Sequence, residues 1–332
     1  MKRRWKILGI LGAVIALFLI VLFVLARKDV PEKIIYGMSY NVPYALELGL
    51  NPDEVFDAIL EDLGVRHLRL AAHWTLIEPM PDQYDFSWMD ADIKKAEAAG
   101  AQVIFGVGRR LPRWPECHVP PWAQALSWED QQKEIREYIE AVVTRYKDSP
   151  AITHWQVENE PFLEVFAHEH CGDLDEAFLK EEVALVRSLD SSRPILVTDS
   201  GNLGMWQGAY RAGDSFGTSV YVYFWNPELG QFRTLLPAWA YRVKENVMSF
   251  LFGEKEAFLI ELSLEPWLIE PVVNVPLEAQ FERMDIDKMD EILSYAEDIC
   301  FEKQYLWGAE WWYWLKEQGH SEIWEHGQEL FK

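Results

Sequence analysis

Two glutamates, Glu160 and Glu261, stand where a pair of carboxyl groups could do acid–base and nucleophilic chemistry. Each comes just after a short run of apolar and β-branched residues, Ile152–Val157 before the first and Ala257–Ile260 before the second. In such a pair one carboxyl group stays protonated and donates, while the other stays ionised and attacks an electrophilic carbon. Because the two glutamates are far apart in the chain, the fold must bring them together.

The elements that must position them are short strand-like runs alternating with longer helical patterns, which is typical of repeated βα units. In the clearest helix, Glu129–Tyr146, apolar residues repeat with the spacing of one buried face. We expect strands at Ile34–Ser39, His67–Ala71, Gln102–Val107, Ile152–Val157, Pro194–Thr198, Ser219–Tyr223, Ala257–Ile260 and Tyr305–Ala309. Eight units without a glycine-rich phosphate loop predict an α/β fold, a closed (β/α)8 TIM barrel, rather than an open sheet.

The sequence Asn159-Glu160-Pro161, after the fourth predicted strand, resembles the strand-four motif of a clan of (β/α)8 retaining glycoside hydrolases. That clan, glycoside hydrolase clan A, includes cellulases, mannanases and β-galactosidases. The resemblance implies that Glu160 is the acid/base, that Asn159 binds the 2-hydroxyl of the sugar, and that Glu261, after the seventh strand, is the nucleophile. Glu265 competes for the last role. Retaining chemistry places the two carboxyl groups about 5 to 5.5 Å apart.

Further residues at the strand ends fit this plan. Arg69 points inward by strand alternation and would hold a catalytic carboxylate ionised, or else form an ion pair in the barrel core. The clan carries a tyrosine after strand six that bonds the nucleophile, and Tyr223 is favoured over Tyr221 because it lies nearer the expected strand end. Substrate contacts are expected from His73, Trp74, Trp114, Trp267, Trp307 and Trp311.

The charge of the chain limits its partners. The formal net charge is −23, and nucleic acid is excluded because phosphate binding needs a basic face. A neutral oligo- or polysaccharide is the expected substrate, and neither a cofactor nor a metal is required. The loop after the third strand concentrates Arg109, Arg110 and Arg113, which would bind a substrate carboxylate or offset nearby acidic residues.

Two of the three cysteines, Cys117 and Cys171, fall in long loops that the barrel topology brings side by side. We expect them to form a disulfide, with free thiols as an alternative. A zinc site is a further alternative, because His118, His168 and His170 lie close to them in the sequence.

The N-terminus predicts a membrane anchor. Residues Ile7–Ala26 form an uncharged apolar run of 20 residues, long enough for a helix to cross a bilayer of about 30 Å. The basic residues before the run place the N-terminus in the cytoplasm and the rest of the chain outside it. A cleavable signal peptide is the alternative. We therefore expect residues 1–28 to form a tip and signal anchor, and residues 29–332 to form one catalytic domain.

The predicted function is a retaining O-glycoside hydrolase that acts on β-linked glycosides at the outer face of the cell membrane. Two non-enzymatic alternatives share the same fold: a carbohydrate-binding barrel with a disabled site, and an envelope scaffold that presents loops to a partner. The sequence favours an enzyme because both carboxylates are present.

Overall fold

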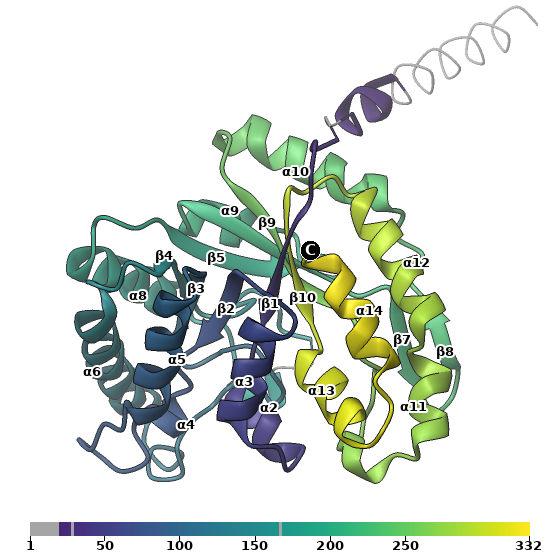
Figure 1. Cartoon of the computed structure of the whole chain (residues 1–332). Helices are drawn as coiled ribbons and strands as arrows, with labels where there is room; N and C mark the ends of the chain where they lie inside the picture. The colour runs from purple at the N-terminus through teal and green to yellow at the C-terminus, as the bar shows by residue number, and fades with distance from the viewer. Residues whose placement is uncertain (1–19, 28–29, 166–167) are drawn as a thin grey trace, which may run out of the picture.

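The computed structural model describes residues 20–27, 30–165 and 168–332. Eight parallel strands close into a barrel in the order β1-β10-β9-β6-β5-β4-β3-β2 (Figure 1), which confirms the predicted (β/α)8 fold. The barrel strands are β1 (Ile35–Ser39), β2 (His67–Ala71), β3 (Gln102–Val107), β4 (Ile152–Val157), β5 (Ile195–Ser200), β6 (Ser215–Val220), β9 (Ala257–Ser263) and β10 (Lys303–Trp307).

Helices surround the barrel and bury their apolar faces against the strands (Figure 1). Helix α6 begins where Ser127 accepts a hydrogen bond from the Asp130 backbone N–H, as serine does at a helix N-terminus. The helices are α2 (Val42–Glu47), α3 (Pro52–Glu61), α4 (Trp74–Ile77), α5 (Ser87–Ala98), α6 (Trp128–Tyr146), α7 (His168–Cys171), α8 (Glu176–Leu189), α9 (Gln207–Ala212), α10 (Ala238–Phe252), α11 (Leu277–Arg283), α12 (Ile286–Glu297), α13 (Ala309–Glu317) and α14 (Glu322–Leu330).

The sixth strand is not where the sequence suggests. The predicted strand Ser219–Tyr223 begins four residues too late, since β6 starts at Ser215 and ends at Val220. The strand is hard to recognise because it contains small residues: at Gly217 an added Cβ would lie 3.0 Å from Ile260 Cβ, so a side chain there would be crowded in the packed barrel interior. An antiparallel hairpin of β7 (Tyr223–Asn226) and β8 (Gly230–Arg233) then precedes α10.

The predicted membrane helix, Ile7–Ala26, falls mostly outside the described residues. Within the part of the chain that the structure describes, no helix is long and apolar enough to span a bilayer. The Asn246 amide nitrogen on α10 donates hydrogen bonds to the Leu25 carbonyl at 2.6 Å and the Arg27 carbonyl at 2.9 Å. These bonds tie the backbone at residues 25–27 to helix α10.

Candidate active site

Glu160 lies at the carboxyl end of β4 on a sharply turned backbone. Both Glu158 and Glu160 have left-handed backbones, with φ of 58° and 44°. Such conformations are strained in residues other than glycine and cluster at functional sites. The Glu160 amide donates to Thr198 Oγ1 at 2.8 Å, and Ser219 Oγ donates to Glu160 Oε1 at 2.5 Å. Strands β5 and β6 therefore fix the backbone and the carboxyl group of this glutamate.

Glu261 reaches the same site because β9 contains a bulge. Phe258 and Ile260 pack inside the barrel while Leu259 and Leu262 pack outside it, so strict alternation would turn Glu261 outward. The pairing registers of β9 with both β6 and β10 shift at this point. A bulge adds one residue and re-aims the next side chain, which directs Glu261 into the barrel mouth.

Arg69 holds the two halves of the site together from β2. Its guanidinium donates to Glu261 Oε2 at 2.9 Å, Asn159 Oδ1 at 2.6 Å and Gln156 Oε1 at 2.9 Å. The Arg69–Glu261 pair is almost wholly buried, so Arg69 lies beside a carboxylate, as both of its predicted roles require. Because the Asn159 oxygen accepts from Arg69, its amide nitrogen is the group that could donate to a sugar hydroxyl.

The second partner of Glu261 is Tyr221, whose hydroxyl donates to Glu261 Oε1. Burial raises the pKa of Tyr221 well above its ordinary value, as do the nearby glutamates, so this hydroxyl keeps its proton. The prediction of Tyr223 for this role is wrong: its hydroxyl donates to Glu291 on an exposed surface. The error follows from the misplaced sixth strand, which ends at Val220.

Replacing Tyr221 with phenylalanine is expected to lower kcat by about 10- to 100-fold, because a hydrogen bond to a charged group is lost. Tyr223→Phe is the matched control, and it should leave kcat and KM on an aryl β-glycoside within twofold, a factor worth about 0.4 kcal/mol. Equal losses of kcat in the two variants would contradict a role for Tyr221 in the site.

The two glutamates differ in electrostatic environment. Burial raises the pKa of Glu160 well above its ordinary value, and the charges of Glu261 and Glu116 raise it further. Glu261 instead accepts from a guanidinium and a phenol, which are partners of an ionised carboxylate. The two carboxyl groups thus have unequal surroundings: burial and nearby charges favour the protonated form of Glu160, while Glu261 accepts hydrogen bonds from a cation and a phenol.

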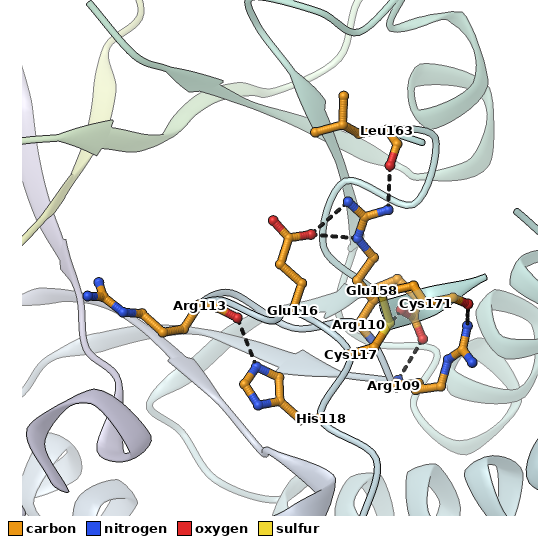
Figure 2. The surroundings of a disulfide bond; sticks show 9 residues. All are labelled: Arg109, Arg110, Arg113, Glu116, Cys117, His118, Glu158, Leu163 and Cys171. Atoms are coloured by element: carbon orange, nitrogen blue, oxygen red, sulfur yellow. Dashed lines mark hydrogen bonds and ion pairs between the residues drawn. A yellow bond between two sulfur atoms is a disulfide. The ribbon is translucent and has the colours of Figure 1, made fainter. Parts of the chain in front are cut away.

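A long loop follows β3 and carries the three arginines (Figure 2). Arg109 donates to the Cys171 carbonyl at 2.7 Å, Arg110 to Glu116 Oε2 at 2.7 Å, and Arg113 to Glu265 Oε1 at 2.6 Å. Arg110 and Arg113 thus each pair with a glutamate, in line with the prediction that the arginines offset acidic residues, whereas Arg109 bonds a backbone carbonyl.

Glu116 lies in this loop and Glu158, just after β4, bonds to it, although neither residue was predicted from the sequence. The Glu158 carboxylate accepts from the Arg109 and Arg110 amides, both at 2.7 Å, and so shapes the start of the loop (Figure 2). Burial raises the pKa of Glu116, although its ion pair with Arg110 opposes that rise. The one sequence feature that could have pointed to Glu158 is its place two residues before Glu160. No sequence feature points to Glu116.

A disulfide joins Cys117 of this loop to Cys171, as predicted, with the two Cα atoms 5.4 Å apart (Figure 2). The pairing removes both thiols, so the alternatives of free thiols or a zinc site with these cysteines are wrong. The bond fixes the loop after β3 to the segment that follows β4 and Glu160.

Removing this disulfide in the double variant Cys117→Ser/Cys171→Ser should lower the free energy of unfolding by about 4 kcal/mol. This is the contribution expected when a disulfide that closes a loop of this length no longer restricts the unfolded chain. The bond spans 54 residues. Thermal unfolding with and without a reductant measures the effect. The reductant should lower the melting temperature of the wild type and leave that of the double variant unchanged; insensitivity of the wild type would contradict the prediction.

The predicted sugar contacts divide into two groups. Trp307 lies at the end of β10 and donates to Glu265 Oε1 at 2.8 Å, and the Trp267 ring meets the Tyr221 ring edge-on at 5.3 Å. Trp307 therefore borders Glu265, and Trp267 borders Tyr221, the partner of Glu261. Trp114 is 59% exposed and contacts His170 at the outer rim.

The other predicted contacts belong to the interior. Trp74 and Trp311 are fully buried and donate to Glu78 and Gln280, so the predictions that they touch substrate are wrong. His73 is also buried, and its Nε2 lies 3.2 Å from the Pro112 carbonyl. It supports the loop after β3 rather than facing a sugar.

Two family models match the chain: glycosyl hydrolase family 10 over residues 68–171 and the beta-galactosidase model of family 42 over residues 123–237. Together with the barrel, these matches define a (β/α)8 fold of the glycoside hydrolase clan A type, similar to families 10 and 42. They support the predicted enzyme class, a glycosidase.

Individual relatives agree with this class. Beta-galactosidase BgaA of Clostridium cellulovorans is 24% identical over 46% of this chain and 25% of its own length. A probable mannan endo-1,4-beta-mannosidase of Aspergillus terreus is 33% identical over 27% of this chain and 24% of its own. The matched region thus spans about a quarter of the length of these relatives.

The fold likeness extends further than the sequence matches. The crystal structure of GH5_18 from Streptomyces cattleya in complex with GlcNAc superposes with a TM-score of 0.57 and 15% identity. The superposition covers 83% of this chain and 70% of the other. At this identity the likeness establishes the fold alone.

Proposed function

We propose that the chain is a retaining glycoside hydrolase that cleaves neutral β-linked glycosides, with Glu160 as acid/base and Glu261 as nucleophile. The observation that carries the proposal is the unequal environment of two buried glutamates at one barrel mouth. Glu261 is held by Arg69 and Tyr221, while burial and neighbouring charges raise the pKa of Glu160 well above its ordinary value. The relatives that are β-galactosidases and a mannanase support a β-linked glycoside as substrate.

The first chemical step uses both residues. The Glu261 carboxylate attacks the anomeric carbon and forms an ester while the glycosidic carbon–oxygen bond breaks. Glu160 gives its proton to the departing oxygen, so the leaving group departs as a neutral alcohol.

The second step reverses these roles. Forming the ester removes the Glu261 charge that helps to raise the pKa of Glu160, so the Glu160 carboxylate can remain ionised. It takes a proton from water as the water oxygen attacks the anomeric carbon and the ester bond breaks. Glu261 leaves as a carboxylate, and the sugar keeps its original anomeric configuration.

The test is hydrolysis of aryl β-galactosides, β-glucosides and β-mannosides, followed by proton NMR of the first product. Retention requires that the β-anomer appear first and then mutarotate, whereas an α-anomer as first product would contradict the mechanism. Binding of sugars without turnover of any glycoside would instead favour the carbohydrate-binding barrel.

We also propose that the enzyme is anchored in the cell membrane by residues 7–26, with the barrel outside the cytoplasm. The apolar run and the basic residues before it support this arrangement. Protease added to intact cells that produce the full chain should digest the barrel, and protection until the cells are lysed would refute the orientation.

A further inference from the structure

The side chain of Arg113 closes one side of the barrel mouth. Arg113 belongs to the loop after β3, whereas its ion-pair partner Glu265 follows β9, and these two strands lie on opposite sides of the ring. Its guanidinium also lies over the Tyr44 ring at 3.0 Å and the Trp307 ring at 5.2 Å. The loop therefore reaches across to the β1, β10 and β9 side.

The backbone on both sides of Arg113 is held in place. His73 contacts the Pro112 carbonyl at 3.2 Å, and His118 contacts the Arg113 carbonyl at 3.1 Å. Burial lowers the pKa of His118 to about 4, so this imidazole stays neutral at physiological pH. Figure 2 shows the Arg113 side chain pointing away from the disulfide that anchors the other end of the loop. These contacts make the closure a fixed part of the site.

The closed side is the one that receives the sugar. In the proposed reaction the leaving group lies next to the acid Glu160, which is fixed by Thr198 of β5 and Ser219 of β6. The sugar that becomes attached to Glu261 must extend the other way, toward β10 and β1. There the Arg113–Glu265 pair would block further extension, because it joins opposite sides of the ring and both side chains are at least 86% buried.

Glu265 also has an unused acceptor. Its Oε1 receives Arg113 and Trp307, but its Oε2 is buried and has no hydrogen-bond partner within the protein. Asn41 Oδ1, just past the end of β1, is a second buried acceptor without a partner. Buried polar atoms nearly always have partners, and leaving one unpaired costs about 1 to 3 kcal/mol. A sugar hydroxyl is the donor that the proposed substrate would bring.

We propose that the enzyme is exo-acting: it takes a single sugar from the non-reducing end, with Arg113 closing the site behind that sugar and Glu265 Oε2 accepting one of its hydroxyls. This inference rests on the proposed glycosidase function. The substrate class is then a terminal, neutral, β-linked pyranoside, and the length of the chain on the leaving-group side is unrestricted.

The first test compares aryl β-glycosides of a monosaccharide and of the matching β-1,4-linked disaccharide. The wild type should release the aryl group directly only from the monosaccharide glycoside; intact disaccharide among its products would overturn the proposal. Arg113→Ala should increase the direct release of disaccharide, relative to monosaccharide, by about tenfold or more, the scale of one binding contact. Arg136→Ala, which breaks an exposed ion pair with Glu181, is the matched control and should not change the ratio.

The second test concerns Glu265 and does not need turnover. Calorimetry measures the binding of methyl β-galactoside, β-glucoside and β-mannoside to the wild type and to Glu265→Gln, which keeps an acceptor for Arg113. The variant should bind the tightest of these ligands about tenfold or more weakly, as loss of a charged acceptor predicts. Equal affinity would refute the role of Glu265. If the wild type binds these sugars but hydrolyses no glycoside, the proposed function is refuted, while the proposed recognition of a single sugar still stands.

Discussion

Replacing Glu261 with glutamine is expected to lower kcat on aryl β-glycosides on the order of 10⁵-fold, as loss of a catalytic nucleophile does in other enzymes. The amide cannot form the ester intermediate, although it keeps the shape of the side chain. Its single carbonyl oxygen can still accept from Arg69 or from Tyr221, which bond different oxygens of the carboxylate. Steady-state kinetics measure the loss. Circular dichroism and the melting temperature show whether the variant is folded, because Arg69 would be left without its countercharge.

Trapping the intermediate identifies the nucleophile directly. A 2-deoxy-2-fluoro β-glycoside with a good leaving group should label the wild type, and peptide mass analysis should place the sugar on Glu261. Glu265→Gln is the control, since Glu265 is the other candidate in the same segment; it should still be labelled at Glu261. A label on Glu265 in the wild type would overturn the assignment.

Replacing Glu160 with alanine is expected to lower kcat/KM by about 10²- to 10⁴-fold for alkyl glycosides, which need proton donation to the leaving oxygen. For dinitrophenyl glycosides, which need little protonation, kcat/KM should change far less. The glycosyl-enzyme should then accumulate, because no base activates the water. Azide should restore turnover and give a β-glycosyl azide; the absence of both effects would contradict the acid/base role.

The dependence on pH gives a second readout for Glu160. Its raised pKa means that the proton is lost only at higher pH, so kcat/KM of the wild type should fall on the alkaline side. Since the acid form is the active one, that limb should disappear in Glu160→Ala. An alkaline limb that persists unchanged in the variant would assign it to another group.

The sequence was sufficient for the barrel and for the expectation that Glu160 and Glu261 lie at the same end of it. Strands β2, β3 and β4 have the predicted bounds, because their apolar, β-branched runs end at clear turns. Glu160 and Glu261 follow from the count of strands. The position of Glu261 inside the barrel depends on the bulge in β9, and no residue of that strand predicts a bulge.

The errors have physical causes in packing. Trp74 and Trp311 follow strand ends, where a barrel places both substrate contacts and the side chains that fill the layer between strands and helices. Local sequence cannot separate these two environments. Likewise Arg113 and Glu265 meet only because a loop crosses from β3 to the opposite strand, which is decided by tertiary contacts.

The bonds that build the site also determine when it can form during folding. Arg69 and Glu261 are 192 residues apart in the sequence. The backbone N–H of Asn41 donates to Glu310 Oε1 at 2.5 Å, and these two residues are 269 positions apart. Contacts of such sequence separation form late, because the entropy of closing long loops must be overcome first. Catalytic activity regained after dilution from denaturant would therefore report the meeting of the first and last βα units, after most helical structure has returned.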